Sequence, residues 1–328
     1  MKEYLGDPYQ VYGVLPYELS EGKARGMRML HLKNGKGLEM DVSLDRNGDI
    51  SALSYKGYNL SYLSSCGYVH GAYYQKQGNG FLSSFTAGFL STCGLTNFGA
   101  SEIDEGEELG LHGSISNTPT SNHSYELKDA SILVKTETRD EEIFSHKLVL
   151  HRFLEMNLDS NSFLIHDEVR NLGDLPSPLM ILYHMNLGYP LLEESSLLKI
   201  SSSSVKGRTP LAQEDIASWM RMEKPQKGYA ERCYYHQMGS APWACLFNPK
   251  LGFGVKITYN PSTLTHFVEW KMMGYRDYVL GLEPGNAYPD GRSKAREDGS
   301  LKTIAPDETV HYDIQVEIID EEQFAKLN

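Results

Sequence analysis

Apolar and polar residues alternate along most of the chain, and short clusters of turn residues separate the alternating runs. A period of two places successive side chains on opposite faces of a β-strand, so it is typical of strands with one buried face. The clearest run is Ser145–Glu155, which is followed by a turn-like segment, Asn157–Asn161, and by a returning run at Ser162–Arg170. The pattern predicts a mostly β protein.

Further runs of the same kind predict six more strands, at Ser131–Glu137, Trp243–Phe247, Phe253–Tyr259, Thr265–Trp270, Tyr278–Leu282 and Thr309–Ile318. Near the N-terminus, Asn34-Gly35 separates Met29–Leu32 from Leu38–Val42. Asn-Gly tolerates the positive φ of a two-residue hairpin turn, so we expect an antiparallel hairpin there.

Helical patterns are few, and we expect helices only at Ala212–Met222 and Glu321–Leu327. A chain of 328 residues is long enough for two ordinary domains. However, we find no internal repeat and no long linker, and strand-like sequence resumes soon after Ser201–Ser204. We therefore predict one all-β domain over residues 1–328, in which residues 319–328 form a short C-terminal tail.

The chain is acidic, with 31 basic and 43 acidic residues and a formal charge of −12. Nucleic-acid binding depends on clustered Lys and Arg, so we expect no nucleic-acid partner. The best apolar run, Pro178–Tyr183, is far shorter than the roughly 18 residues that a membrane-spanning helix needs. Met1–Pro8 lacks the basic start and the apolar stretch of a signal peptide. We expect a cytoplasmic protein without a membrane partner.

The sequence offers little support for metal or thiol chemistry. Asp45–Asp49 resembles a calcium loop only in part, because its glycine is misplaced and its twelfth position is Lys56 instead of Glu. The four cysteines form no CxxC pair, and we interpret them as reduced packing residues: Cys66, Cys93, Cys233 and Cys245.

Several familiar catalytic motifs are absent from the sequence. No GxGxxG, GxxxxGK[ST], GxSxG or HExxH motif occurs, which argues against dinucleotide, P-loop, esterase and zinc-protease chemistry. The 11 histidines show no helical metal spacing with Cys or carboxylates. His151 and His166 alternate with apolar strand residues, and we interpret both as structural or surface histidines.

Three segments each place a titratable residue among glycines, prolines and aromatics at the end of an apolar run. These residues are His112, His184 and Glu283. Taken singly, they have ordinary interpretations as a loop histidine, a buried histidine and a solvated turn carboxylate. Taken together, two imidazoles and one carboxylate suffice for general acid–base chemistry near neutral pH.

Five segments that include these residues occur in a characteristic order: Thr92–Asn97, Leu111–Pro119, Leu182–Pro190, Trp270–Lys271 and Tyr278–Pro284. With them the chain resembles the galactose mutarotase-like superfamily, the aldose 1-epimerases, and in particular its DUF4432 branch, from about Leu38 to Val316. The resemblance implies a large antiparallel β-supersandwich with a sugar cleft on one concave face. It also implies a small sugar as substrate and no metal or organic cofactor.

The resemblance further implies roles for three residues in the interconversion of sugar anomers. Glu283 is the base that takes the proton of the anomeric hydroxyl, and His184 is the acid that protonates the ring oxygen, so that the ring opens. After rotation about the C1–C2 bond, the same steps run in reverse. His112 is a second imidazole that holds a sugar hydroxyl or the ring oxygen. We therefore expect an isomerase that acts on an aldose or a modified sugar.

Chemistry, more than motif, suggests further substrate-binding residues. Trp270 is a candidate for stacking on the apolar face of the sugar, with core packing as the ordinary alternative. Candidates for hydrogen bonds to a polyhydroxylated ligand are Arg46, Asn97, Glu231, His236, Lys271 and Asn286. For Arg46 the alternative is a surface turn residue, and for Glu231 it is a solvated charge.

Two other functional classes stay open at this point. The first is a carbohydrate-binding or sensing protein without turnover. The second is a glycoside hydrolase, which needs two carboxylates flanking the scissile bond; Asp290, seven residues after Glu283, is a possible second carboxylate. Position 114 is Ser where many relatives carry Arg, and this difference leaves the identity of the sugar open.

Overall fold

The computed structural model describes residues 2–327. Met1 and Asn328, the two ends of the predicted domain range, lie outside the described residues. The described chain consists mainly of antiparallel strands in three larger sheets and two small strand pairs. None of the described helices is long and apolar enough to cross a membrane.

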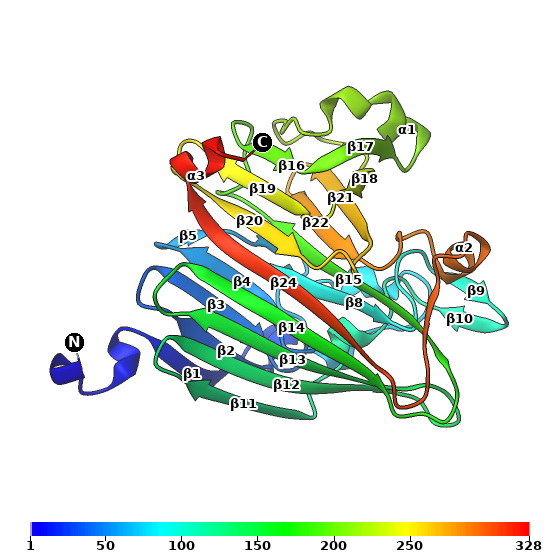
Figure 1. Ribbon diagram of the computed structural model, residues 1–328, viewed down its shortest axis with the longest axis horizontal. Coiled ribbons are helices and arrows are strands. Elements are labelled where there is room, and N and C mark those ends of the chain that lie inside the picture. The colour runs from blue at the N-terminus through cyan, green and yellow to red at the C-terminus, as the bar shows by residue number, and fades with distance from the viewer. Residues whose placement is uncertain (1, 328) are drawn as a thin grey trace.

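The largest sheet has eight strands in the order β11-β12-β13-β14-β24-β20-β19-β16. Figure 1 shows them side by side across the width of the molecule. Their bounds are β11 Asn122–Leu127, β12 Ser131–Glu141, β13 Lys147–Asn157, β14 Ser162–Asn171, β24 Thr309–Asp320, β20 Phe253–Tyr259, β19 Trp243–Asn248 and β16 Leu197–Ile200.

A seven-stranded sheet has the order β17-β18-β21-β22-β15-β23, and β8 pairs with β15 outside this path. Its strands are β17 Ser202–Gly207, β18 Arg232–Met238, β21 His266–Met273, β22 Tyr278–Gly285, β15 Ser177–Leu187, β23 Lys302–Ile304 and β8 Leu90–Leu95. This sheet carries most of the candidate site that is described below.

A five-stranded sheet near the N-terminus runs in sequence order, with β1 Gly13–Glu18, β2 Arg28–Lys33, β3 Leu38–Ser43, β4 Asp49–Tyr55 and β5 Tyr58–Asn59. The two small pairs are β6 Tyr62–Leu63 with β7 Ala87–Gly88, and β9 Glu102–Asp104 with β10 Glu107–Leu109. The α-helices are α1 Pro210–Glu214, α2 Arg292–Glu297 and α3 Glu321–Ala325. Single 3-10 turns occupy Lys2–Tyr4, Pro8–Gln10, Gly22–Ala24, Gly71–Tyr73, Gly80–Ser83, Ile115–Asn117 and Ile216–Ser218.

One hydrophobic core joins the three larger sheets. It contains Leu32 from the five-stranded sheet, Leu150 and Ile165 from the eight-stranded sheet, and Ile181 and Leu280 from the seven-stranded sheet, each at most 1% exposed. Because every sheet buries one face in this core, the period-two pattern of the sequence is explained. The predicted strands are confirmed, with ends that differ by a few residues.

Two predicted strand segments differ in detail. The hairpin between β2 and β3 is present, but its loop spans residues 34–37, because Asn34 Oδ1 accepts hydrogen bonds from the backbone N–H groups of Lys36 and Leu38. β24 continues to Asp320 and α3 follows directly, so the strand includes the first two residues of the predicted tail. Phe324 of α3 stacks on Phe247 of β19, with ring centroids 4.6 Å apart.

The predicted helix at residues 212–222 is shorter in the structure. α1 begins after Thr209, whose hydroxyl accepts a hydrogen bond from the N–H of Ala212, and a 3-10 turn at Ile216–Ser218 replaces its continuation. The sequence analysis also missed β8 and β15. Nearly every residue of these two strands is buried, so neither shows an alternation of apolar and polar residues.

A buried ion-pair network orients β15. Arg152 Nη2 lies 2.7 Å from Asp167 Oδ2 and its Nη1 lies 2.6 Å from Asp49 Oδ1, so the eight-stranded and five-stranded sheets are linked. Tyr183 of β15 donates its hydroxyl to Asp167 at 2.8 Å. Since neighbouring side chains of a strand point to opposite faces, His184 points away from this network.

Candidate functional site

His184 and Glu283 face each other across two adjacent antiparallel strands. The register of β15 and β22 pairs Leu182 with Gly285 and Met185 with Leu282, which places His184 directly opposite Glu283. His184 Nε2 and Glu283 Oε1 are 3.2 Å apart, and the two side chains are only 6% and 3% exposed. The predicted acid and base therefore form one buried pair. His184 lies within β15 instead of at a strand end.

Gly281 provides the space that the Glu283 carboxylate occupies. In β22, Gly281 lies two residues before Glu283 on the same face, and it pairs with Trp270 of β21. A Cβ atom at position 281 would collide with Glu283 Oε1 and would lie 3.0 Å from the Trp270 Cβ. A side chain at this position would therefore displace the carboxylate or the indole.

His112 reaches the pair from a loop that follows β10. Its φ of +61° is a conformation that residues other than glycine seldom adopt. Two backbone hydrogen bonds hold it there: its N–H donates to the Gly99 carbonyl at 3.0 Å, and its carbonyl accepts from the Gly94 N–H at 3.1 Å. The imidazole lies edge-on to that of His184, with ring centroids 5.7 Å apart.

Three aromatic rings surround the two imidazoles. Phe81 contacts His112 with centroids 5.1 Å apart, and Phe85 and Trp270 lie edge-on to His184 at 5.6 and 5.2 Å. These residues line a cavity of about 500 Å³. Its size lies within the range of roughly 300 to 1,000 Å³ that is usual for small-molecule sites.

Polar groups complete the lining of the cavity. Glu231, which directly precedes β18, accepts a hydrogen bond from Trp270 Nε1 at 2.8 Å and so fixes the indole. Arg208 also lines the cavity, while its Nε donates to Asp290 Oδ1 at 2.9 Å. Cys233, which pairs with Trp270 in the β-sheet register, is buried in the same wall.

Burial governs the protonation states of the pair. It raises the pKa of Glu283 well above its usual value, and the nearby carboxylate of Glu231 adds to this effect while Arg208 opposes it. Burial lowers the pKa of His184 to about 3, with a further contribution from His112. Burial and Arg208 lower the pKa of His112 to about 4. Near neutral pH, both imidazoles are therefore neutral, and burial favours the protonated form of Glu283.

Each of these three side chains keeps a polar atom unused. His112 Nδ1, His184 Nδ1 and Glu283 Oε1 are buried and have no hydrogen-bond partner among the described residues; Glu283 Oε1 lies 3.2 Å from His184 Nε2 without forming a hydrogen bond to it. Leaving such an atom unpaired costs about 1–3 kcal/mol, so a ligand that supplies hydroxyl groups would recover this free energy. The cavity therefore offers a ligand free hydrogen-bonding atoms beside titratable side chains.

Of the ten residues predicted from the sequence, five line the cavity: His112, His184, Glu231, Trp270 and Glu283. The sequence analysis missed Phe81, Phe85 and Arg208, which lie outside the segments that carry the resemblance. It also treated Cys233 only as a packing residue. Nothing in the local sequence distinguishes these four positions from ordinary core or loop residues.

The other five predicted residues do not line this cavity, and each makes hydrogen bonds inside the protein. Arg46 Nη1 donates to Asn117 Oδ1 at 3.0 Å. Asn286 accepts a hydrogen bond from the Ile181 N–H at 2.9 Å and donates one to the Leu179 carbonyl at 2.8 Å, so it joins the end of β22 to β15.

His236 and Lys271 belong to the opposite face of the seven-stranded sheet. His236 Nε2 lies 3.2 Å from Glu269 Oε2, and Lys271 Nζ donates to the Ser218 carbonyl at 2.9 Å. Glu269 and Lys271 flank Trp270 in β21 and therefore point away from the cavity.

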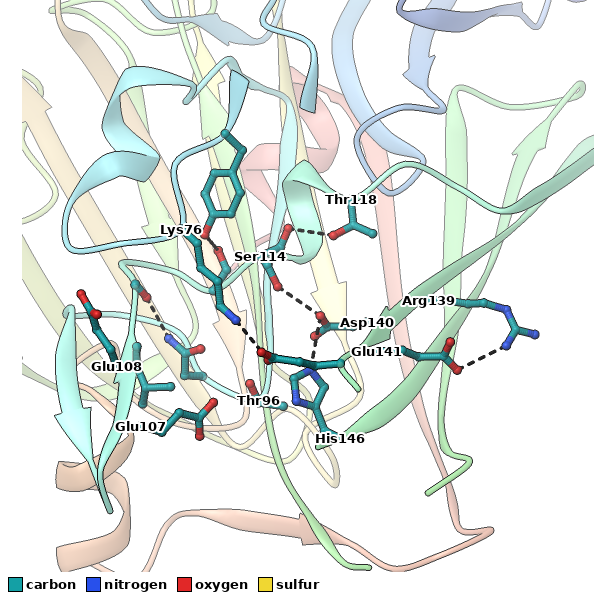
Figure 2. Close-up of a pocket in the computed structure, with 16 residues that line it drawn as sticks. Lys76, Thr96, Glu107, Glu108, Ser114, Thr118, Arg139, Asp140, Glu141 and His146 are labelled. Carbon is teal, nitrogen blue, oxygen red and sulfur yellow. Dashed lines mark hydrogen bonds and ion pairs between the residues drawn. The ribbon is translucent and has the colours of Figure 1, made fainter. Parts of the chain in front are cut away.

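Asn97 lies in a second, smaller cavity of about 250 Å³, where its amide donates to the Gly110 carbonyl at 2.8 Å. Figure 2 shows several of the charged groups of this cavity paired with one another, while Glu107 and Glu108 have no marked contact in this view. Its contacts include Lys76 with Glu142 at 3.2 Å and His146 with Asp140 at 3.6 Å. This cavity lacks the unpartnered acid–base pair of the first one.

The comparison with protein families settles where the chain belongs. Residues 24–318 match the family described as "Domain of unknown function (DUF4432)". The chain is a member of the DUF4432 family. No curated protein sequence matches it.

Solved structures share the fold of this DUF4432 protein. A protein from Klebsiella pneumoniae subsp. pneumoniae MGH 78578, described as a "putative aldose 1-epimerase", matches with a TM-score of 0.89 and 23% identity over 96% of this chain and 90% of that one. Galactose 1-epimerase from Lactobacillus acidophilus NCFM matches with a TM-score of 0.64 and 12% identity, over 94% and 99% of the two chains.

A galactose mutarotase-like protein from Clostridium acetobutylicum also matches, with a TM-score of 0.66 and 15% identity over 95% of this chain and 99% of that one. At these identities the likeness establishes the fold. The predicted all-β, galactose mutarotase-like architecture and the DUF4432 resemblance are therefore confirmed.

Proposed function

We propose that this DUF4432 protein is an aldose 1-epimerase-like isomerase that interconverts the anomers of an aldose or a modified sugar. The observation that carries the proposal is the buried pair of His184 Nε2 and Glu283 Oε1, 3.2 Å apart in the wall of a cavity of sugar size. Anomer interconversion needs one group that accepts a proton and one that donates a proton close to the same ring atoms. The pair supplies both.

The reaction assigns a separate task to each member of the pair. The Glu283 carboxylate accepts the proton of the anomeric hydroxyl, and the His184 imidazolium donates a proton to the ring oxygen. The bond between C1 and the ring oxygen breaks, and a C1 carbonyl forms. After rotation about C1–C2, the ring oxygen attacks the other face of the carbonyl while both protons return to their origins.

Burial favours the protonation state that the pair has in the middle of this reaction. Once the ring has opened, Glu283 is protonated and His184 is neutral, which is the state that burial favours in the free site. The closed sugar requires the proton on His184 instead. A hydrogen bond between His184 Nε2 and Glu283 Oε1, which are 3.2 Å apart, would carry that transfer once the two side chains align, and Arg208, which opposes the rise in the Glu283 pKa, stabilises the resulting carboxylate.

The surrounding residues position the sugar. His112 Nδ1 is buried and unpartnered among the described residues, and it serves as a hydrogen-bonding group for a sugar hydroxyl or the ring oxygen. The faces of Trp270, Phe81 and Phe85 offer apolar surface to the C–H groups of the ring. Glu231 holds the indole of Trp270 in place.

Polarimetry tests the proposal. Freshly dissolved α-anomers of a panel of aldoses are followed with and without the wild-type protein, and we expect faster optical rotation change for at least one sugar. His184→Gln should reduce this acceleration by about 10²- to 10⁴-fold, the usual contribution of a general acid. A sugar that raises the melting temperature but is never converted faster would instead favour a binding or sensing protein.

A further inference from the structure

A cluster of histidines and carboxylates lies on the outer face of the eight-stranded sheet, apart from the cavity. In β14 the buried residues Ile165 and Asp167 alternate with His166 and Glu168, which point outward and are partly exposed. No residue of β14 or β24 lines the cavity that contains His184. The proposed isomerase activity assigns no role to this cluster.

The strand register places two histidines and two carboxylates next to one another on the outer face of the sheet. β14 and β24 are antiparallel neighbours, in which His166 pairs with Asp313 and Glu168 pairs with His311. Figure 1 shows the two strands side by side, although they lie far apart in the sequence. Residues two apart in a strand share a face, so all four side chains emerge together.

The donor atoms lie at distances that suit a metal ion. His166 Nε2 is 3.4 Å from Glu168 Oε1, and His311 Nδ1 is 3.6 Å from the same oxygen. The three atoms all lie within 4.8 Å of one another. Bonds of about 2.0–2.2 Å to a tetrahedral ion place its ligand atoms roughly 3.3–3.6 Å apart, so small side-chain movements would complete the site.

Asp313 adds the support that metal-binding histidines commonly have. His166 Nδ1 lies 2.6 Å from Asp313 Oδ1. If this nitrogen carries the proton, the lone pair of Nε2, which lies 3.4 Å from Glu168 Oε1, is free to bind a metal ion. A carboxylate that fixes the tautomer and orientation of a histidine in this way is the usual second layer of a metal site.

We propose that His166, Glu168 and His311 bind one divalent transition-metal ion of the zinc class, with Asp313 as the supporting carboxylate. Imidazole ligands suit zinc, copper and nickel and do not suit magnesium or calcium. Two carboxylates and two neutral imidazoles balance the charge of the ion. The partial exposure of all three ligands leaves a fourth position open to water.

A metal ion bound by His166, Glu168 and His311 would link β14 to β24. The ligands meet only in the folded chain, so the ion stabilises the folded state by mass action. The sequence gives no sign of the site, because the pairing is across strands and the spacing of the ligands along the chain follows no metal motif.

The test uses the full chain without a polyhistidine tag, freed of metal by chelation and titrated with ZnCl₂ in a calorimeter. We expect one Zn²⁺ ion per chain. Asp313→Asn should weaken the affinity by about 10- to 100-fold, as the loss of a supporting carboxylate does elsewhere. His311→Ala, which removes a ligand, should weaken it further. His123→Ala, which removes an exposed histidine of β11, is the matched control and should leave the affinity unchanged.

Two further measurements keep the result unambiguous. The melting temperature without metal shows whether His311→Ala folds, which we expect because the side chain is 53% exposed. Co²⁺ should give the absorption bands of a tetrahedral site with the wild type and not with His311→Ala. Absence of stoichiometric Zn²⁺ binding by the wild type, or equal affinities for the wild type and His311→Ala, would overturn the proposal.

Discussion

His184 is a titratable residue that the fold keeps uncharged. It lies against aromatic rings and a second imidazole, and its pKa falls to about 3 because burial disfavours the imidazolium. Such a residue lowers the free energy of unfolding in acid, because its imidazole binds a proton in the unfolded chain at a pH at which it stays neutral in the folded chain. The cost is measurable and gives a direct test of the electrostatics of the site.

The free energy of unfolding should therefore depend on pH through His184. The unfolded side chain titrates near 6.5 and the folded one near 3, so this residue favours unfolding progressively as the pH falls below 6.5. The slope is about 1.4 kcal/mol per pH unit for one such group. Urea unfolding of the wild type and His184→Gln between pH 6 and pH 4 should show the wild type losing more stability, by about that amount per unit. Parallel pH profiles of the two proteins would contradict the account.

The sequence singled out the three central residues of the candidate site but not their surroundings. His112, His184 and Glu283 stood out because each follows an apolar run and lies among glycines and prolines. The lowered pKa values of the two histidines could not be predicted, because they come from burial and from neighbours such as Arg208 that lie far away in the sequence. For Asn286 and Arg46, the sequence could not show that internal hydrogen bonds already use the side chains.

At the scale of the strand, the register of β21, β22 and β15 creates the site. It sets His184 opposite Glu283 and Trp270 opposite Gly281. Successive side chains of each strand point to opposite faces of the sheet. On the face away from the cavity, Glu269 and His236 form a second buried pair. One sheet thus presents two Glu–His pairs, of which only one borders the cavity.

Gly281→Ala should disturb the site while the strand is retained. The new methyl group would collide with the Glu283 carboxylate, so we expect the anomerisation rate to fall by at least about tenfold, together with a loss of stability of about 1–3 kcal/mol from overpacking. Gly239→Ala is the control, because a Cβ at that position meets nothing within 4 Å. Polarimetry and urea unfolding measure both effects. Wild-type activity in Gly281→Ala would show that the carboxylate position is unimportant.

At this scale the sequence predicted four of the five longest strands and missed β15. Hydrophobic alternation located β12, β13 and β14. It could not locate β15, whose residues are almost all buried and which carries His184. The most important strand of the site was therefore found only through the resemblance of the segment around His184.

Ion pairs and hydrogen bonds between the sheets stabilise the whole molecule, together with the shared hydrophobic core. Arg152 is 2% exposed at its side chain and bridges Asp49 and Asp167, while Thr92 accepts a hydrogen bond from Nη2 at 2.7 Å. The bridge connects all three larger sheets, since Thr92 belongs to β8. Removing one partner of a buried pair leaves the other charges uncompensated.

Arg152→Leu should therefore lower the free energy of unfolding by about 3–5 kcal/mol. Arg170→Leu is the matched control, because Arg170 lies on the same sheet and its contact with Asp307 is between side chains that are 47% and 82% exposed. Such a surface pair contributes about 0–1 kcal/mol. Urea unfolding distinguishes the two variants, and equal losses would show that the buried network does not link the sheets energetically.

The central claim is that the Glu–His pair bordering the cavity performs proton transfer on a sugar. Glu283→Gln and Glu269→Gln provide a matched test, because each variant alters a buried Glu whose oxygen lies 3.2 Å from a histidine Nε2, on opposite faces of one sheet. The measurement is the rate of exchange between the α and β anomers of a responsive aldose at equilibrium, by NMR. The account predicts that Glu269→Gln retains the wild-type rate and that Glu283→Gln falls to the uncatalysed rate. Equal rates for wild type and Glu283→Gln would contradict it.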